Sequence, residues 1–287
     1  MSDPNQLAHG VRVLLANASL YAAAALRVRA EAGRSIGRPG AGEERLVFVV
    51  GSPRSGTTFT ARALGSLPGF LDLGEVKPLK AAIPWLAGDG EQVVAGEVRM
   101  VLERVRKLSL TRHLRCVEQT PETSFVLPAA LRAYPDAVAV HVLRDGRDVV
   151  CSLLERGWLS SQRDGADDVG APFGAYPRFW VEPERREEFE RASDATRAAW
   201  AWRRYATAAA AAPERTAELR YELLATDPGG AAARVADRLG TDPEPLARAF
   251  AAAHDRSLGR WRHDLRPEQL ADVEREAGPL LRELGYD

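Results

Sequence analysis

Apolar positions along this chain form short runs with the character of strands, separated by longer stretches with helical spacing. Residues 46–50 are continuously apolar and end at Gly51, a pattern typical of a buried strand in a parallel sheet. Shorter runs at residues 70–73, 114–118 and 138–142 predict three further strands. The first half of the chain therefore alternates between strand and helix.

Several helices are expected around these strands. Residues 5–31 are alanine-rich and place most of their leucines on one side of a helix, and residues 91–110 have the amphipathic pattern of a helix that covers a sheet. Residues 189–212 predict one helix whose large aromatic side chains belong to the core. Another helix begins at Asp227-Pro228, because an aspartate cap followed by proline is typical of a helix start.

The loop after the first strand predicts an anion-binding site. Residues 51–58 read G-S-P-R-S-G-T-T, and helical spacing follows directly. A strand that runs through a glycine-containing loop into a helix leaves several backbone N–H groups unpaired at the helix start, with the positive end of the helix dipole behind them. These groups point at one spot that an anion can occupy.

The residues of this loop also indicate which anion fits. Gly51 and Gly56 have the separation found in nucleoside-triphosphate loops, but Thr57 stands where those loops carry a lysine for the β- and γ-phosphates. Arg54 is the loop's only cation. This set suits a nucleotide with a shorter anionic group and no metal. A metal-dependent nucleotide kinase or hydrolase with an atypical loop stays open, with Asp145 as its magnesium ligand.

Composition narrows the class of protein. The 287 residues have a formal net charge of −1, so no general basic field attracts nucleic acid or an anionic membrane. The apolar part of residues 5–31 is only about 14 residues long, too short to span a bilayer. Cys116 and Cys151 do not suggest a disulfide or metal framework. We expect a cytoplasmic protein with no nucleic-acid partner, and we do not expect membrane contact. A role of the N-terminal helix in assembly or membrane contact stays open.

The same loop carries a family resemblance. Residues 53–58, P-R-S-G-T-T, match all six positions of the loop P-[KR]-S-G-T-T in the sulfotransferases that use 3'-phosphoadenosine 5'-phosphosulfate. The chain resembles that family from residue 46 to residue 286. The resemblance implies an α/β fold with three α/β/α layers and a central parallel sheet of five or so strands, the P-loop-like sulfotransferase fold. It also implies that the donor's phosphosulfate is held by Arg54, Ser55, Gly56, Thr57 and Thr58.

A second motif resembles the 3'-phosphate site of the same family. Arg144 follows the strand at residues 138–142, and Ser152 lies eight residues further on, the spacing with which relatives hold the 3'-phosphate. An arginine fork matches phosphate geometry, and a hydroxyl two turns into the following helix can lie beside it. We leave Arg147 and Asp148 outside the site, as an exposed ion pair.

Two later segments also resemble the family. Residues 216–224 are similar to a strand ending whose tyrosine contacts adenine, which makes Tyr221 a candidate, with core packing as the alternative. Residues 257–262 read S-L-G-R-W-R, a run that supplies further contacts to the 3'-phosphate in bacterial relatives. The resemblance therefore assigns Gly259 to the site, with Arg260 or Arg262 completing a phosphate clamp.

A general base is expected where the second strand ends. Glu75 follows that strand, and relatives place a glutamate in a similar context, where it deprotonates the acceptor hydroxyl. Glu118 is the second candidate. Relatives often read E-K-T-P there, but this chain has Gln119 in place of the lysine, which leaves more of the charge stabilisation to Arg54. His141, among valines in a strand, is interpreted as a satisfied core histidine.

The predicted organisation is an N-terminal helix and linker over residues 1–43, followed by a sulfotransferase domain over residues 44–287. Residues 157–190 lack regular patterning, and we expect a lid or acceptor loop there, or aromatic residues packed on the surface. The implied reaction transfers a sulfuryl group from 3'-phosphoadenosine 5'-phosphosulfate to a small molecule, carbohydrate or peptide tyrosine without a metal, leaving 3'-phosphoadenosine 5'-phosphate. A non-catalytic nucleotide-binding protein stays open, and the sequence predicts no oligomeric state.

Overall fold

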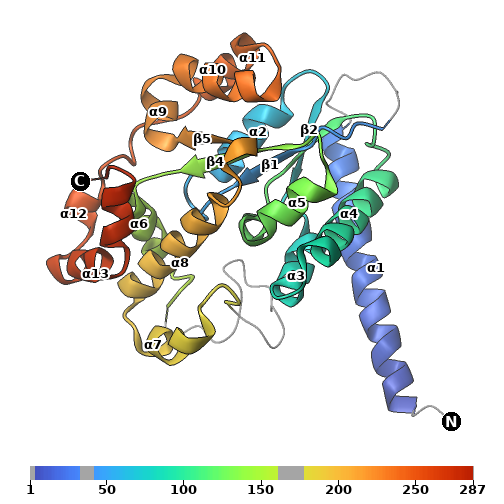
Figure 1. Ribbon diagram of the computed structural model, residues 1–287, viewed down its shortest axis with the longest axis horizontal. Coiled ribbons are helices and arrows are strands. Elements are labelled where there is room, and N and C mark those ends of the chain that lie inside the picture. Colours follow the sequence, from blue (N-terminus) through green and yellow to red (C-terminus); the bar gives the residue numbers. More distant parts are fainter. Residues whose placement is uncertain (1–3, 33–41, 161–177, 287) are drawn as a thin grey trace.

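A parallel β-sheet forms the centre of the molecule (Figure 1). The computed structural model describes residues 4–32, 42–160 and 178–286. Five strands lie in the order β2-β3-β1-β4-β5, and all neighbouring pairs are parallel. The strands are β1 Val47–Val50, β2 Phe70–Gly74, β3 Arg115–Glu118, β4 Val138–Leu143 and β5 Thr216–Arg220. The expected five-stranded parallel sheet is confirmed, with each strand in its predicted segment.

The strand order brings two loops together. β1 lies between β3 and β4, so the chain leaves β1 toward one edge of the sheet and later returns to its other side. At the carboxyl end of β1, Val50 lies beside His141 of β4. Ligands of open α/β sheets bind where the strand order reverses in this way, at the carboxyl ends of the strands. The loops that follow β1 and β4 therefore border the same space.

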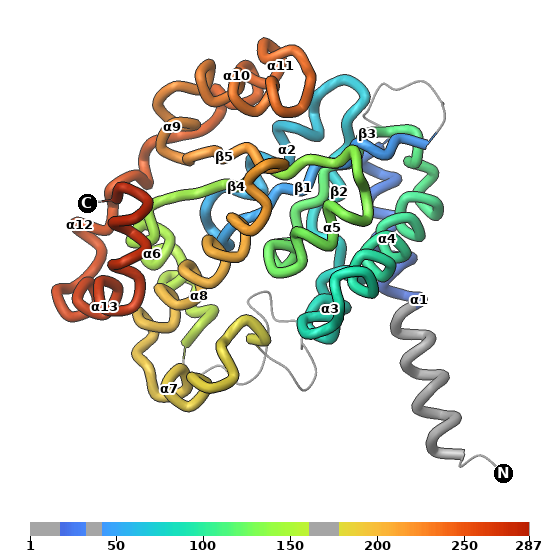
Figure 2. The backbone as a smooth tube through the Cα atoms, viewed as in Figure 1, coloured from blue at the N-terminus to red at the C-terminus, as the bar shows by residue number. Residues whose placement is uncertain are grey.

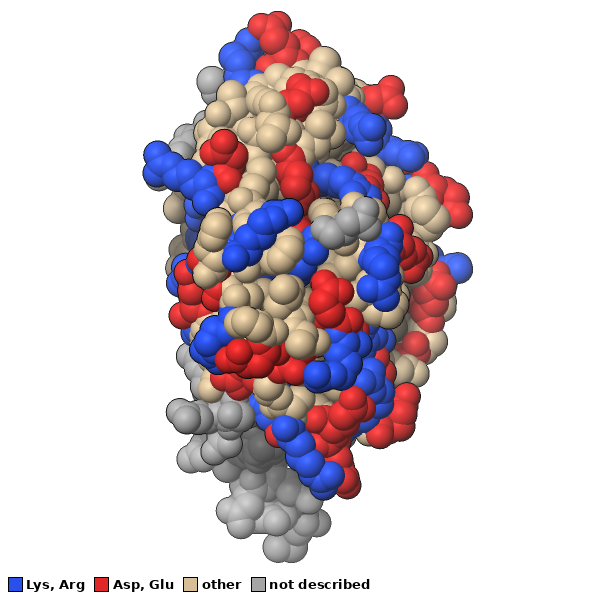
Figure 3. Space-filling view, turned by 90° about the vertical axis from the view of Figure 1, so that its left-hand side faces the viewer, with Lys and Arg blue, Asp and Glu red and all other residues tan. Residues whose placement is uncertain are grey.

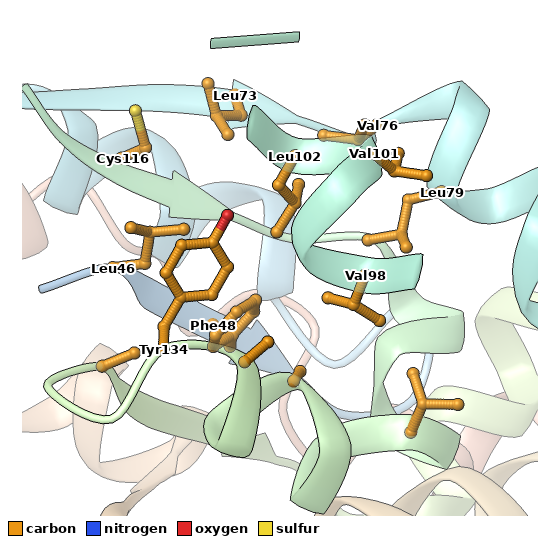
Figure 4. Close-up of a cluster of buried hydrophobic side chains, with 14 of the residues drawn as sticks. Leu46, Phe48, Leu73, Val76, Leu79, Val98, Val101, Leu102, Cys116 and Tyr134 are labelled. Carbon is orange, nitrogen blue, oxygen red and sulfur yellow. The ribbon is translucent and has the colours of Figure 1, made fainter. Parts of the chain in front are cut away.

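One face of the sheet packs against helices from the first half of the chain. Phe48 and Val50 of β1 point into this core, and Figure 4 shows Phe48 beside Tyr134, whose ring centroid is 6.3 Å away. The leucines and valines of the helices fill the space above them. The helices on this face are α1 Pro4–Ala32, α3 Lys77–Leu86, α4 Glu91–Leu108 and α5 Leu127–Ala133.

The other face carries a separate core. Val47 and Val49 of β1 alternate with the residues of the first face and pack here with Leu64 and Leu219. The helices on this face are α2 Thr57–Gly65, α9 Tyr221–Thr226, α10 Pro228–Leu239 and α11 Pro243–Phe250. Helices on both faces of one sheet make the three-layer α/β/α architecture that the sequence predicts.

A third cluster lies beyond the end of β4. Trp200 and Trp202 are fully buried in it, as expected of these aromatic residues. Figure 2 shows the C-terminal helices lying beside α6 and α8, which come from the middle of the chain. The helices of this region are α6 Gly146–Arg156, α7 Arg186–Arg191, α8 Asp194–Ala209, α12 Trp261–Asp264 and α13 Pro267–Glu283. Short 3-10 helices are η1 Pro121–Val126, η2 Pro183–Arg185 and η3 Pro213–Arg215.

Two helix predictions need correction. The single helix expected over residues 189–212 is divided into α7 and α8, because Ser193 caps a new helix by accepting a hydrogen bond of 3.1 Å from the Thr196 amide. The short helices α3 and α5 were not predicted. Both carry a proline at their starts, and α3 also contains Pro84, so their sequences lack a clear helical pattern.

The N-terminal helix packs against the body of the molecule through its last turns. Ala24 and Val28 of α1 belong to the core under α3 and α4. Within the described ranges, no helix combines the length and apolar character needed to cross a membrane. Most of the expected linker and of the expected acceptor loop, at residues 33–41 and 161–177, lies outside the described residues.

Charges of both signs are mixed on the face shown in Figure 3. Ion pairs occur among the charged side chains of the protein, for example Arg260 with Glu155 and Arg275 with Asp272. Such a surface has no field of one sign, consistent with the net charge of −1. Any site for an anionic ligand must therefore depend on a local group of arginines.

Candidate active site

The loop after β1 has a strained and tightly packed backbone. Gly51 has a φ of 137°, and a Cβ atom there would lie 2.4 Å from the carbonyl oxygen of Val142 in β4, so only glycine fits. The Gly51 amide donates a hydrogen bond of 3.1 Å to Ser124 Oγ. Arg54 has a φ of 73°, a left-handed conformation that costs a non-glycine residue about 1–2 kcal/mol. Such strain is commonly found at functional sites.

The start of α2 offers hydrogen-bond donors to the space above this loop. Gly56 is the N-cap residue, so no side chain caps the first amides of the helix. A Cβ atom at Gly56 would lie 2.6 Å from the ring of Tyr221, which covers the glycine closely. Ser55 Oγ is buried and has no hydrogen-bond partner within the described part of the chain. This donor set has the chemistry of an anion cradle.

A pocket of about 320 Å³ opens above the loop. It is lined by Arg54, Gly56, Thr57, Thr58, Phe59, Arg144, Ser152, Glu155, Tyr221, Ala252, Ala253, His254, Ser257 and Arg260. The fold thus brings most of the predicted donor-binding residues together from four separate segments. Ser55, Gly259 and Arg262 are the predicted residues that do not line this pocket.

Arg54 connects the two predicted phosphate motifs. Its Nε donates a hydrogen bond of 3.0 Å to Ser152 Oγ on α6, and its carbonyl oxygen accepts one of 3.4 Å from Arg144 Nη1. Burial, together with the nearby guanidinium groups of Arg156 and Arg144, lowers the pKa of Arg54. An anion in the pocket would relieve this excess of positive charge.

Arg144 is 6% exposed and is fixed on several sides. Its Nη2 donates to the carbonyl oxygen of Ser257, and its guanidinium lies 4.8 Å from the centroid of the Tyr221 ring. The carboxylate of Asp148 is 3.8 Å away. Arg144 Nε is buried and has no hydrogen-bond partner among the residues described. Tyr221 itself begins α9, and its hydroxyl donates a hydrogen bond of 3.2 Å to the His254 carbonyl.

Asp148 anchors the segment that carries Arg260. Its carboxylate accepts hydrogen bonds from the amides of Gly259 at 2.8 Å and Trp261 at 3.1 Å. The expected exposed pair of Arg147 and Asp148 is therefore wrong. Both side chains are buried, and Arg147 pairs instead with Asp145, at 2.8 Å.

The two candidate clamp arginines differ in position. Arg260 lines the pocket and also pairs with Glu155 and Asp264. Arg262 is exposed, does not line the pocket, and lies 4.5 Å from the centroid of the Trp261 ring. The structure thus places Arg260, and not Arg262, on the side of Arg144.

A smaller pocket of about 70 Å³ also borders the loop. It is lined by Pro53, Arg54, Thr57, Thr58, Glu75, Lys80, Pro121, Glu122 and Trp158. Arg54, Thr57 and Thr58 line both pockets. Glu75 follows β2 as predicted, and its Oε2 lies 3.1 Å from Lys80 Nζ.

Glu118 lies in neither pocket. Its Oε1 accepts a hydrogen bond of 2.7 Å from the Thr120 amide, and its Oε2 accepts one of 2.9 Å from Thr123 Oγ1. Burial raises the pKa of Glu118 to about 7. One carboxylate oxygen thus holds the backbone after β3, and the other binds a side chain of η1. Gln119 instead reaches the loop, where its Oε1 accepts a hydrogen bond of 3.4 Å from Thr58 Oγ1.

His141 is buried in β4, as expected, but it is not fully satisfied. Its Nε2 has no hydrogen-bond partner within the described part of the chain. Burial lowers its pKa to about 4, so the ring is neutral at neutral pH. Cys116 and Cys151 are buried free thiols, in line with the absence of a disulfide pattern in the sequence.

Comparison with known proteins decides the family. The model of the sulfotransferase family matches residues 91–245, more than half of the chain. The chain belongs to the sulfotransferase family. The match contains β4, Arg144 and Ser152, while the loop at residues 51–58 precedes it.

Solved sulfotransferase structures share the fold. One from Mycobacterium avium superposes with a TM-score of 0.53 at 13% identity, covering 86% of this chain and 78% of that one. The sulfotransferase domain of an olefin synthase from Synechococcus PCC 7002 has a TM-score of 0.51 at 14% identity, covering 88% of this chain and 98% of that one. Identities this low show a common fold and no more.

Sequence relatives match over a shorter part of the chain. A Caenorhabditis briggsae protein, provisionally named a protein-tyrosine sulfotransferase, is 31% identical over 123 residues, which is 39% of this chain and 44% of that protein. An uncharacterised protein of Aquifex aeolicus is 28% identical over 135 residues, 41% of this chain and 18% of that protein. The chain thus spans less than half the length of either relative.

Sequence reasoning missed three residues around the site. Lys80 and Glu122 were not singled out, because each lies in a short helix that the apolar pattern does not reveal. Asp148 was set aside as an exposed charge. The one signal in the sequence was that Asp148 lies in the first turn of a helix capped by Asp145. An acidic side chain is favoured near a helix start, where it can accept hydrogen bonds from nearby amides.

Proposed function

We propose that this sulfotransferase moves a sulfuryl group from 3'-phosphoadenosine 5'-phosphosulfate to the hydroxyl of an acceptor, leaving 3'-phosphoadenosine 5'-phosphate. The observation that carries the proposal is the shared wall of the two pockets, made by Arg54, Thr57 and Thr58. A donor in the larger pocket and an acceptor in the smaller one would meet at these residues. Holding two reactants in contact in this way accounts for much of the power of such enzymes.

The donor set of the larger pocket fits a nucleotide with two anionic groups. We assign Arg54, Thr57 and Thr58, with the open amides at the start of α2, to the 5'-phosphosulfate. Ser55 lies beneath this cradle, and its unpartnered hydroxyl is a further donor.

A second set suits the 3'-phosphate. We assign Arg144, with its unpartnered Nε, together with Ser152 and Arg260 to that group. The role of Gly259 is to hold the Arg260 segment through its bond to Asp148. The ring of Tyr221 offers a flat wall for adenine. The lining of the larger pocket contains three arginines and one carboxylate, that of Glu155, which favours the doubly anionic nucleotide over one without the 3'-phosphate.

The residues at the junction of the pockets suit transfer without a metal. When bound, the donor supplies an activated sulfuryl group with a phosphate as its leaving group. Arg54 and the α2 amides stabilise the negative charge that develops on the leaving oxygen. Glu75 lies across the smaller pocket and accepts the proton of the acceptor hydroxyl. Gln119 orients the Thr58 hydroxyl through their hydrogen bond.

A nucleotide kinase has less support from the same residues. Thr57 stands in place of the phosphate-binding lysine. Both carboxylate oxygens of Asp145, the candidate magnesium ligand, accept hydrogen bonds from Arg147 at 2.8–3.2 Å.

The proposal does not fix one acceptor. The hydroxyl of a small molecule, of a carbohydrate or of a peptide tyrosine can serve as the acceptor. The name of the C. briggsae relative places tyrosine peptides first in a screen.

A transfer assay tests the proposal. The purified protein is incubated with sulfur-labelled donor and a panel of tyrosine peptides, sugars and phenols, and both labelled acceptor and released 3'-phosphoadenosine 5'-phosphate are measured. We expect transfer to at least one acceptor class, and its loss in Arg54→Ala. Tight binding of the bisphosphate without transfer to any class would favour a non-catalytic nucleotide-binding protein.

A further inference from the structure

The geometry points to Lys80 as the residue that positions Glu75 and balances its charge during proton transfer, with Glu122 as the fixed counter-ion of Lys80. This inference rests on the proposed function, because it concerns the base in that reaction. It adds to the site a lysine from α3 and a glutamate from η1, neither of which the sequence motifs include.

The three charged groups form one cluster at the wall of the smaller pocket. Lys80 Nζ lies 3.1 Å from Glu75 Oε2 and 3.5 Å from Glu122 Oε1. The side chains of Lys80 and Glu122 are 9% and 4% exposed, whereas that of Glu75 is 34% exposed. The lysine is therefore held in the protein interior by Glu122, and it presents its ammonium to Glu75, the more exposed of the two carboxylates.

Of the two carboxylates in the cluster, Glu75 is the one that can take up a proton at the lower cost. With both carboxylates ionised, the three side chains carry a net charge of −1. When Glu75 gains a proton, Lys80 and Glu122 remain as a neutral buried pair, which avoids the cost of an isolated buried charge. If Glu122 gained the proton instead, the partly exposed Glu75 would keep its charge and the buried site would lose its own counter-ion. Glu75 is thus the member of the cluster suited to exchange a proton.

The backbone around Glu75 is fixed from two further directions. Arg27 of α1 donates hydrogen bonds to the carbonyl oxygens of Leu73 and Glu75, the latter at 3.1 Å. The Val76 amide donates one of 2.9 Å to Thr120 Oγ1. These contacts hold the main chain, but only Lys80 is paired with the Glu75 carboxylate in the described structure.

Other charged groups near Glu75 act from a greater distance. Arg54 lines the same pocket from the loop after β1, and Glu122 faces it from η1. Arg27 approaches from α1 and contacts the backbone, and among the described residues no other charged side chain lines that pocket. Among the described residues, Lys80 is therefore the charged group in direct contact with the Glu75 carboxylate.

The proton and electron pairs of the step balance. As the acceptor oxygen forms its bond to sulfur, its proton passes to Glu75. The bond between sulfur and the bridging phosphate oxygen breaks, and its electron pair stays on the phosphate. Lys80 keeps its proton throughout, so it acts on the reaction through Glu75.

The test compares Lys80→Met with Lys80→Arg. Lys77→Met is the matched control, since Lys77 is on the same helix but is exposed and lines neither pocket. For each variant, kcat/KM for the acceptor identified in the transfer assay is measured from about pH 5 to about pH 9. The affinity for 3'-phosphoadenosine 5'-phosphate is measured by calorimetry.

We expect the acid limb of the Lys80→Met profile to move up by about one pH unit, because a carboxylate that has lost its cation takes up a proton more readily. Well below the midpoint, this is a tenfold loss of kcat/KM. Lys80→Arg should restore the wild-type profile, and Lys77→Met should keep it. Affinity for the bisphosphate should be unchanged in all three variants, since Lys80 does not line the larger pocket.

A second variant protects the test against misfolding. If Lys80→Met does not fold because Glu122 loses its counter-ion, Lys80→Met with Glu122→Gln restores the charge balance and should show the same displaced limb. An unmoved limb in a folded variant, with Glu75→Gln inactive, overturns this inference alone. Full activity of Glu75→Gln overturns the assignment of the base, and the inference with it.

Discussion

The Nε atom of Arg54 donates a hydrogen bond of 3.0 Å to Oγ of Ser152, a residue 98 positions later in the chain. This bond joins the loop after β1 to the helix after β4, and so joins the predicted phosphosulfate site to the predicted 3'-phosphate site. The adjacency follows from the strand order, which places β1 beside β4. One nucleotide can therefore contact both motifs.

Replacing Arg54 tests its role at the junction of the two pockets. Arg54→Ala removes the cation nearest both pockets, so we expect turnover to fall by about 100-fold or more, with a much smaller loss of affinity for 3'-phosphoadenosine 5'-phosphate. Steady-state kinetics and calorimetry measure the two effects. Arg156→Ala is the control. Arg156 is the last residue of α6 and lies near Arg54, but it lines neither pocket. Turnover at the wild-type level in Arg54→Ala would remove this residue from the mechanism.

Replacing Arg144 tests the 3'-phosphate assignment. The loss of hydrogen bonds to a charged group should weaken the bisphosphate by about 1.5–3 kcal/mol, roughly 10- to 100-fold, and leave adenosine 5'-phosphate nearly unaffected. Titration calorimetry with both nucleotides gives the comparison. Arg262→Ala should have little effect on either, because Arg262 lies outside the pocket. Equal losses for the two nucleotides in Arg144→Ala would contradict the assignment.

The two glutamates considered as the base should behave in opposite ways. Glu75→Gln should reduce turnover by about 100- to 10,000-fold in a folded protein that still binds the bisphosphate. Glu118→Gln should keep most of its activity, because Glu118 lines neither pocket and its oxygens accept hydrogen bonds from the Thr120 amide and the Thr123 hydroxyl. The measurement is kcat for both variants at saturating donor. An active Glu75→Gln and an inactive Glu118→Gln would exchange the two roles.

Glu118 also predicts how the free energy of unfolding depends on pH. Burial raises its pKa from 4.5 to about 7, so between these values the folded protein holds a proton that the unfolded chain has released. The stabilisation from this group is complete below the lower value and is lost as the pH rises through the upper one. Relative to Glu118→Gln, the wild-type protein should therefore lose on the order of 1–3 kcal/mol of stability between about pH 5 and about pH 8.

Urea unfolding of both proteins across that range measures the difference. His141 acts in the opposite sense, because its pKa is lowered to about 4 and the unfolded chain takes up a proton as the pH falls below 6.5. Since His141 is present in both proteins, its contribution cancels in the comparison. A difference that does not change with pH would show that Glu118 is ionised in the folded protein at all these values.

Much of the fold was predictable because its inner strands, β3, β1 and β4, are buried on both faces. Val47 to Val50 form an uninterrupted apolar run, and such runs stand out from the helices around them. The loop motif and the pair of Arg144 and Ser152 could be proposed as site residues from the sequence, because each lies within one short segment, and residues of both line the larger pocket.

The remaining parts depend on contacts between distant segments. A role for Lys80 can be inferred only once Glu75 and Glu122 are known to lie close to it. The apolar pattern of the sequence does not show that α3 and η1 are in contact. The left-handed conformation of Arg54 could not be predicted either. Glycine at a position can signal a positive φ, but an arginine gives no such signal in the sequence. Asp148 was misjudged because its partners are backbone amides, which no side-chain pattern can reveal.

The most direct test of the central claim is a thermal-shift comparison of the purified protein with 3'-phosphoadenosine 5'-phosphate, with adenosine 5'-phosphate, and with ATP plus magnesium. A ligand that binds only the folded state adds about 2.7 kcal/mol of stability at 100 times its dissociation constant, which gives a measurable shift. We predict strong stabilisation by the bisphosphate alone, because Arg54 is placed to bind its 5'-phosphate and Arg144 its 3'-phosphate. Stabilisation by ATP with magnesium, and none by the bisphosphate, would contradict the proposed donor.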